Sequence, residues 1–257
     1  PEDGIVVSSG PLIFEGTAEQ PITLAPQVGT ETWGGMISVR TDAPHVFKHV
    51  VVRSTSGIKL DGWRLTGGVT LRFADVKISD STFTGDRGED ALNIIRSRFE
   101  LSRVVFHDTT SDALDVDFSE GVIQGGRFSK IGGDGIDVSG TQITIDGTVL
   151  TEINDKAISV GEASRLTARN IRIEKVSIGA ASKDGSVLVL EDSFVSEATT
   201  AAVSAYTKKP VYGPAQARID RVEMQNVATK TLVQMGSRAT VDGVDAVEQP
   251  FDTDIMY

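Results

Sequence analysis

The sequence ALNIIRSRFELSRVVFHDTTSD (residues 91–112) is followed directly by two further stretches that repeat its pattern. They read ALDVDFSEGVIQGGRFSKIGGD over residues 113–134 and GIDVSGTQITIDGTVLTEINDK over residues 135–156. Each copy is 22 residues long. A unit this short cannot bury a core by itself, so a fixed repeat of this length indicates stacked turns.

Each copy begins with alternating apolar and polar side chains. The second and fourth positions are apolar, whereas the third and fifth are mostly polar. This alternation predicts a short β-strand with one face inside and the other in water. Gly, Asp and Asn at the corners tolerate left-handed backbone angles, which favours an all-β fold, the right-handed parallel β-helix with three short strands per turn. Extending the period over the chain gives a solenoid of about nine to ten turns.

The repeat predicts how the rest of the chain is organised. Counting in steps of 22 places further turn starts at residues 157, 179 and 201, and earlier ones at residues 69 and 47. We expect a single domain over residues 1–257 with four parts: irregular N-terminal turns over 1–46, regular turns over 47–200, a turn with a loop insertion over 201–229, and a last turn with a C-terminal tail over 230–257. The insertion is expected around TKKPVYGPAQ (residues 207–216), where two prolines and a glycine prevent a continuous strand.

Composition excludes several classes of partner. The 257 residues carry a formal net charge of −11, which repels a phosphate backbone, so no nucleic-acid partner is expected. There are no cysteines for disulfides or thiolate metal sites. No stretch approaches the ~20 apolar residues of a membrane span. The start at Pro1, with neither Met nor a signal region, indicates a processed protein or a piece of a longer one. We expect a monomer or part of a longer chain, in an extracellular or periplasmic setting.

Stacked turns place equivalent residues about 4.8 Å apart, which predicts two ladders of polar side chains. The outward ladder comprises Asn93, Asp115, Asp137 and Ser159, with Asp117 beside it. The corner ladder comprises Asp90, Asp112, Asp134 and Lys156, with Glu89 and Asp155 beside it. Like charges at this spacing repel, so some carboxyls must keep a proton at a raised pKa, pair with a cation or bind a metal. Acidic residues are also ordinary turn formers, so a purely structural ladder is the alternative.

The stretch GGDGIDVSG (residues 132–140), followed one turn later by INDKAISVG (residues 153–161), resembles consecutive turns of the pectate-lyase-like superfamily. It is most similar to polygalacturonase-type glycoside hydrolases, whose turns read Asn-Thr-Asp-Gly-Ile-Asp and then Asp-Asp-x-Ile-x-Ile. The resemblance implies action on a polysaccharide, with Asp134 and Asp155 matching two of that family's three catalytic carboxylates. The sequence departs from the family at the third, where Lys156 stands, and at the Gly-His-Gly turn, which here reads SIGAASKDG.

Three functions remain open. Carboxylates roughly 5 Å apart suit a retaining glycosidase, and those about 6.5 to 9.5 Å apart suit an inverting one. A lyase or epimerase would instead bind Ca²⁺, which prefers six to eight oxygens, to neutralise a uronate carboxylate, while Lys156 or Lys183 removes the adjacent proton. The stretches DKAISVGEAS and GAASKDGS are also similar to β-helices beside spore-coat-protein-H-like kinases, which implies a non-catalytic glycan-binding, Ca²⁺-binding or scaffold domain.

Together these features predict a β-helix that engages a polysaccharide through its acidic strand face. Candidate catalytic residues are Asp134, Asp155, Lys156 and Lys183. Candidate Ca²⁺ ligands are Asp112, Asp115, Asp134 and Asp137. Candidate substrate-binding residues are Asn93, Asp117, Ser159, Tyr206 and Tyr212. The two tyrosines are included because loops hold exposed aromatic rings. An enzyme should also have a groove over the ladder, although residues 91–200 contain no insertions that would wall one.

Overall fold

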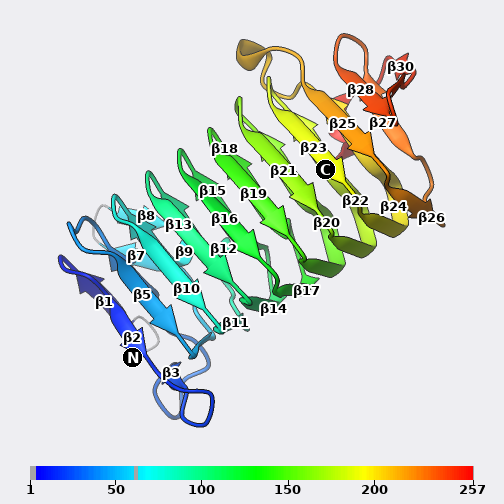
Figure 1. Cartoon of the computed structure of the whole chain (residues 1–257). Helices are drawn as coiled ribbons and strands as arrows, with labels where there is room; N and C mark the ends of the chain where they lie inside the picture. The colour runs from blue at the N-terminus through cyan, green and yellow to red at the C-terminus, as the bar shows by residue number, and fades with distance from the viewer. Residues whose placement is uncertain (1–3, 61–62, 257) are drawn as a thin grey trace.

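The computed structural model describes residues 4–60 and 63–256, and these residues form a right-handed parallel β-helix (Figure 1). Three strands make up each regular turn, and each strand pairs in parallel with its equivalents on the neighbouring turns. The predicted fold is therefore confirmed. Within the described residues, no helix has the length and apolar character needed to span a membrane.

The first strand of each turn carries the polar ladders. These strands are β1 (Ile5–Ser8), β4 (Gly35–Ser38), β9 (Gly67–Arg72), β12 (Asp90–Ile95), β15 (Asp112–Asp117), β18 (Ile136–Ser139), the second halves of β20 (Val149–Gly161), β22 (Arg172–Lys183) and β24 (Phe194–Tyr206), β27 (Thr231–Gln234) and β30 (Glu248–Gln249). The three long strands turn a corner without a break, so they supply the third strand of one turn and the first strand of the next.

The other two strand sets complete the turns. The second strands are β2 (Ile13–Glu15), β5 (His45–Lys48), β10 (Val76–Ser79), β13 (Arg98–Ser102), β16 (Glu120–Gln124), β19 (Gln142–Asp146), β21 (Arg165–Arg169), β23 (Val187–Glu191), β25 (Gln216–Asp220) and β28 (Arg238–Val241), with β29 (Val244–Asp245) antiparallel at the end. The third strands are β3 (Ile22–Leu24), β6 (Val50–Arg53), β11 (Thr82–Thr84), β14 (Val105–Thr109), β17 (Arg127–Ile131) and β26 (Glu223–Gln225). A hairpin of β7 (Ile58–Leu60) and β8 (Trp63–Leu65) and two short 3-10 helices, η1 (Pro210–Tyr212) and η2 (Thr253–Met256), lie outside these sets.

The register confirms the 22-residue period in the middle of the chain and corrects it at both sides. Asn93 pairs with Asp115, and Asp115 pairs with Asp137. Val69, however, pairs with Leu92 rather than with residue 91, so the turn start predicted at 69 is one residue late. The turn before it is longer still, because the β7–β8 hairpin is inserted between β4 and β9.

Two further predicted turn starts are wrong. Phe47 lies in β5, among the second strands, where it pairs with Ile78. The start predicted at residue 201 comes one residue later, because the pairing of β22 with β24 shifts register after Val176. The expected loop insertion follows directly: β24 ends at Tyr206, and β25 begins at Gln216.

Columns of like side chains fill the interior. Phe83, Phe106 and Phe128 occupy equivalent positions on consecutive turns, and their rings stack with centroids 5.0 and 4.8 Å apart. Each is almost completely buried. Because each ring contacts its equivalent above and below, the column ties neighbouring turns together and fixes their register.

The corner between the first and second strands is held by hydroxyl groups. The backbone N–H of Ser97 donates to Ser119 Oγ (3.0 Å), that of Ser119 to Thr141 Oγ1 (3.2 Å), and that of Thr141 to Ser164 Oγ (2.9 Å). These bonds satisfy buried backbone groups that the turn leaves unpaired.

Candidate functional site

The outward ladder is the core of the site. Asn93, Asp115, Asp137 and Ser159 pair in order across four turns, as predicted. Asn93 Nδ2 donates a hydrogen bond to Asp115 Oδ2 at 2.7 Å. The prediction that this face lies in water is wrong, since Asn93 and Ser159 are buried and the two aspartates are only partly exposed. The ladder therefore places carboxyl groups in a largely desolvated surface.

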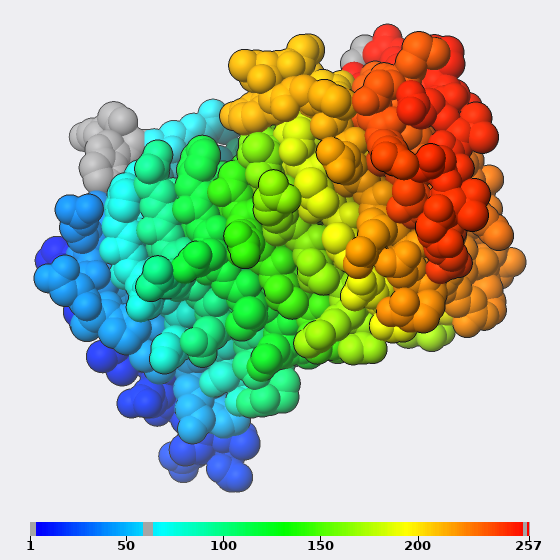
Figure 2. All heavy atoms as spheres, turned by 45° about the horizontal axis from the view of Figure 1, so that its top comes forward, coloured from blue at the N-terminus to red at the C-terminus, as the bar shows by residue number. Residues whose placement is uncertain are grey.

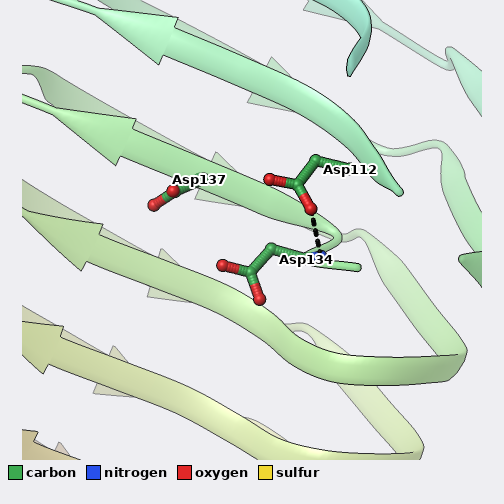
Figure 3. Close-up of side chains that lie close together, drawn as sticks. All are labelled: Asp112, Asp134 and Asp137. Atoms are coloured by element: carbon green, nitrogen blue, oxygen red, sulfur yellow. Dashed lines mark hydrogen bonds between the residues drawn. The ribbon is translucent and has the colours of Figure 1, made fainter. Parts of the chain in front are cut away.

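The corner ladder meets the outward one. Asp112 Oδ1 accepts the backbone N–H of Asp134 at 2.7 Å, and Asp134 Oδ1 accepts that of Lys156 at 2.9 Å. Each corner carboxylate thus caps the following turn. Asp112, Asp134 and Asp137 also bring one carboxylate oxygen each to within 4.8 Å of the others (Figure 3).

Burial raises the pKa of most carboxyls in this cluster, because desolvation opposes the charged form. It is the largest cause of a pKa of about 7 at Asp112 and about 9 at Asp115, and repulsion by neighbouring aspartates adds to it. The pKa of Asp134 and that of Asp137 are also raised by burial, but Lys156 and Lys183 respectively oppose that rise. Burial and mutual repulsion therefore favour the protonated form throughout this cluster, whereas the two lysines favour the ionised form of Asp134 and Asp137.

Two lysines supply positive charge inside the cluster. Lys156 Nζ donates to Asp155 Oδ2 at 2.7 Å and lies 3.7 Å from Asp134 Oδ1. Lys183 Nζ lies 3.7 Å from Asp137 Oδ1. The Lys156 side chain is completely buried, so its predicted role as a base that touches substrate is contradicted by its position. It compensates the charge of Asp134 and Asp155 instead.

The donor set suits Ca²⁺ poorly. Of the four predicted ligands, Asp115 lies outside the group of three close carboxylates and is hydrogen-bonded to Asn93. Asp112 and Asp134 already each use an oxygen on a backbone N–H, and an ammonium group lies near Asp134 and another near Asp137. A hard cation that prefers six to eight oxygens would have to displace these partners.

The other predicted substrate-binding residues divide. Asp117 is half-buried beside the ladder, and Tyr212 is 43% exposed in η1. Tyr206 is wrong as an exposed loop residue, because it ends strand β24 and is fully buried. Its ring packs edge-on against Phe251, with centroids 6.4 Å apart, in an apolar cluster that covers this end of the first-strand face.

Sequence reasoning missed two groups at the edge of the site. Glu162 accepts hydrogen bonds from Ser139 Oγ and from Lys209 Nζ. Lys209 belongs to the insertion loop, which projects beyond the neighbouring turns in yellow-orange in Figure 2. The repeat could not indicate Lys209, because it predicts neighbours only for residues within the 22-residue period, and the insertion loop lies outside it.

A groove of about 790 Å³ lies beside the ladder and not over it, where an enzyme was expected to have one. It follows the adjacent corner between the first and second strands, where Arg40, Phe73, Arg96, Phe118 and Arg165 are among its lining residues.

The comparisons with known proteins agree with this architecture. Residues 90–213 match the family described as "Right handed beta helix region". The match agrees with the right-handed parallel β-helix that the strand pairing shows. No curated protein matches the sequence significantly.

Several solved structures are similar in fold. The Agl-KA catalytic domain is 12% identical with a TM-score of 0.41, over 92% of this chain and 62% of that one. The A-module of a mannuronan C-5 epimerase from Azotobacter vinelandii is 14% identical with a TM-score of 0.39, over 96% of this chain and 84% of that one. An alginate lyase from a Paenibacillus species is 11% identical with a TM-score of 0.38, over 91% of this chain and 89% of that one. The chain spans less than two thirds of the Agl-KA domain.

Proposed function

We propose that this protein hydrolyses a polysaccharide at its acidic strand face, using carboxyl groups on neighbouring turns as acid and nucleophile. The observation that carries the proposal is the group formed by Asp112, Asp134 and Asp137, whose oxygens lie within 4.8 Å of one another and whose pKa values are all raised. Glycoside hydrolysis needs one carboxyl that is still protonated at working pH and a second that is ionised, and a separation near 5 Å suits retention of configuration.

The surroundings assign the two roles. Asp112 has a pKa of about 7 and is partly exposed, so it is the acid. Asp137 is partly exposed, and the ammonium of Lys183 beside it opposes the rise in its pKa that burial causes, so we assign Asp137 as the nucleophile. Asp134 is 7% exposed and caps the next turn, so it positions the pair rather than touching substrate.

The reaction then runs in two steps. Asp112 gives its proton to the glycosidic oxygen as the bond to the anomeric carbon breaks, and the Asp137 carboxylate forms an ester with that carbon. A water molecule, losing its proton to Asp112, then attacks the same carbon and releases Asp137 as a carboxylate. The sugar gains one water across the cleaved bond, and both groups return to their starting state.

A lyase or epimerase is supported less well, because it needs an unprotonated base beside the substrate. Lys156 is buried and donates to Asp155, and Lys183 lies beside Asp137. The other candidate is a non-catalytic glycan-binding domain. It is favoured by the structural use of Asp112 and Asp134 as caps and by the position of the 790 Å³ groove away from the ladder. For either function we propose a setting outside the cytoplasm and polysaccharide as the partner.

A panel of acidic and neutral polysaccharides tests the reaction. The protein is incubated with each polymer in Ca²⁺ or in a chelator, and products are assayed for new reducing ends and for unsaturated ends. We expect reducing ends without unsaturated ends, at a rate that neither Ca²⁺ nor the chelator changes. Unsaturated products would establish a lyase instead, and an absolute need for Ca²⁺ would contradict the metal-free scheme.

Matched variants locate the chemistry. Asp137→Asn and Asp112→Asn should each lower turnover by about 10²–10⁴-fold while leaving the melting temperature near that of the wild type, since asparagine still accepts hydrogen bonds. Asp146→Asn is the control, because Asp146 pairs with Arg169 on another strand set. Absence of turnover on every polymer would leave the non-catalytic alternative.

A further inference from the structure

The groove along the corner between the first and second strands contains two exposed or half-exposed phenylalanines at unusual backbone positions. Phe73 and Phe118 have φ values of +55° and +49°. Positive φ is unfavourable for a bulky residue, and Gly140 occupies the equivalent place one turn beyond Phe118. The Phe118 ring is also 55% exposed to solvent. The corner itself imposes the positive φ, because Arg96 and Glu162 share it at the equivalent positions of other turns. What the fold does not explain is the choice of large aromatic side chains at this corner, and we look for that reason in binding.

Arginines accompany both rings. The Cζ atom of Arg40 lies 5.3 Å from the Phe73 centroid, and that of Arg96 lies 5.1 Å from the Phe118 centroid. Arg165 lines the same groove three turns further along the chain than Arg96. None of these three guanidinium groups forms an ion pair with another residue in the described ranges 4–60 and 63–256. They therefore remain available for an external anion.

The lining of this groove is rich in arginine for a chain with a net charge of −11. Four arginines line it together with three carboxylates, Asp42, Asp75 and Glu120. In the described part of the chain, Arg98 alone among these arginines forms an ion pair, with Glu120 at 2.5 Å. Flat apolar rings beside planar guanidinium groups suit a ligand with apolar ring faces and carboxylate or sulfate substituents. Repetition of the corner from turn to turn extends the groove along the axis, as a linear polymer requires.

We propose that this groove is a second glycan-binding site, which holds an acidic polysaccharide chain by stacking on Phe73 and Phe118 and by ion pairs to Arg40, Arg96 and Arg165. Asp117 and Phe118 are adjacent in sequence, with Asp117 beside the ladder and Phe118 in the groove. A polymer bound here runs alongside the acidic strand face. This proposal specifies an acidic polysaccharide as the ligand. It requires that the protein binds a glycan, but not that the protein is an enzyme.

Binding is measured calorimetrically in an Asp137→Asn background, so that turnover cannot consume the probe. The probes are oligosaccharides of polygalacturonate, alginate and chondroitin sulfate, with dextran and a β-glucan as neutral comparisons. We expect at least one acidic probe to bind, more weakly as salt is added, and the neutral probes not to bind. Failure of every acidic probe to bind, or equal binding of the neutral ones, overturns the proposal.

Substitutions then place the binding in the groove. Phe118→Gly and Arg96→Gln should each weaken binding by about tenfold or more, the range of one desolvated cation–aromatic contact. Phe118→Gly should not lower the melting temperature, because glycine adopts positive φ freely, so lost binding cannot be ascribed to unfolding. Arg172→Gln is the matched control: its Cζ lies 4.2 Å from the Phe194 centroid, outside the groove.

The outcomes separate this site from the proposed reaction. Unchanged affinity in both groove variants, or an equal loss in Arg172→Gln, overturns the groove assignment whatever the enzyme assays give. If the wild-type protein, which keeps Asp137, binds glycan in the groove but cleaves no polymer, the proposed hydrolysis is wrong and the groove proposal is unaffected.

Discussion

Asp115 is the carboxyl in the ladder whose charge its surroundings oppose most clearly. Burial first, and then the negative charges of Asp90 and Asp117, raise its pKa to about 9, against about 3.9 in an unfolded chain. Between these values the folded protein holds a proton that the unfolded chain has released. The stability that this group contributes is therefore complete below about pH 4 and is lost as the pH rises toward 9. We expect the melting temperature to fall from pH 5 to pH 9.

Asp115→Asn tests this cause directly. The variant keeps an acceptor for Asn93 but has no charge to desolvate, so its melting temperature at pH 8 should exceed that of the wild type by roughly 2–5 °C. At pH 4 the two proteins should melt nearly together. Scanning calorimetry at both pH values makes the comparison. A variant that melts earlier than the wild type at pH 8 would mean that the folded ladder prefers the ionised carboxylate.

Lys156 is expected to stabilise the fold through its carboxylate partners. Its ammonium is completely buried between Asp155 and Asp134, so Lys156→Met leaves a buried carboxylate without its cation and should lower the free energy of unfolding by about 3–5 kcal/mol. Adding Asp134→Asn should recover part of that loss. Urea unfolding measures both variants, with the exposed Lys77→Met as control. Equal stability of the single and double variants would show that Asp134 takes up a proton when Lys156 is removed.

At the scale of elements, Asp184 fixes the insertion loop beside the site. It is 1% exposed, and its Oδ1 accepts the backbone N–H groups of Lys208 and Lys209 at 2.7 and 2.5 Å. Asp184→Ala removes both bonds, so amide hydrogen exchange over residues 207–213 should accelerate by about tenfold or more. Asp192→Ala, which removes an exposed ion pair with Arg221, should leave that exchange unchanged. Unaltered exchange in Asp184→Ala would mean that other contacts hold the loop.

The sequence predicted the strands and the ladder wherever the period holds. The repeat over residues 91–156 was enough to place Asp115 between Asn93 and Asp137, because a fixed turn length sets the register. It failed at Val69 because the turn from Val69 to Leu92 has 23 residues instead of 22. It failed at Phe47 because the β7–β8 hairpin lengthens the turn before β9 by an amount that no periodicity shows.

Burial on the ladder face could not be predicted in the same way. Alternation indicates which side of a strand a residue faces, but not whether another segment covers that side. Tyr206 is buried because the chain near Phe251 and Met256 returns over the first-strand face. Likewise, the ion pair of Lys183 with Asp137 joins side chains two turns apart. Counting in steps of one turn predicts only which residues lie together on adjacent turns, so it could not predict this contact.

For the whole molecule, the stacked design means that a complete turn is a removable unit. Each turn pairs only with the turns before and after it, so stability is approximately a sum over neighbouring pairs. Deleting residues 113–134 joins Asp112 to Gly135 and places Phe106 against Leu150 and Asn93 against Asp137. Each of these contacts preserves the original register, because 22 residues are one full turn here.

The shortened protein should therefore fold, with the same β-type circular dichroism, a monomeric elution volume that is larger only because the protein is smaller, and one cooperative melting transition. Deleting residues 113–123 alone removes half a turn, which sets β12 against strands of another face and exposes apolar side chains, so this control should aggregate. If the full-turn deletion also aggregates, stability depends on contacts that cross more than one turn, such as that between Lys183 and Asp137. The stability of the β-helix would then not be a sum over neighbouring pairs of turns.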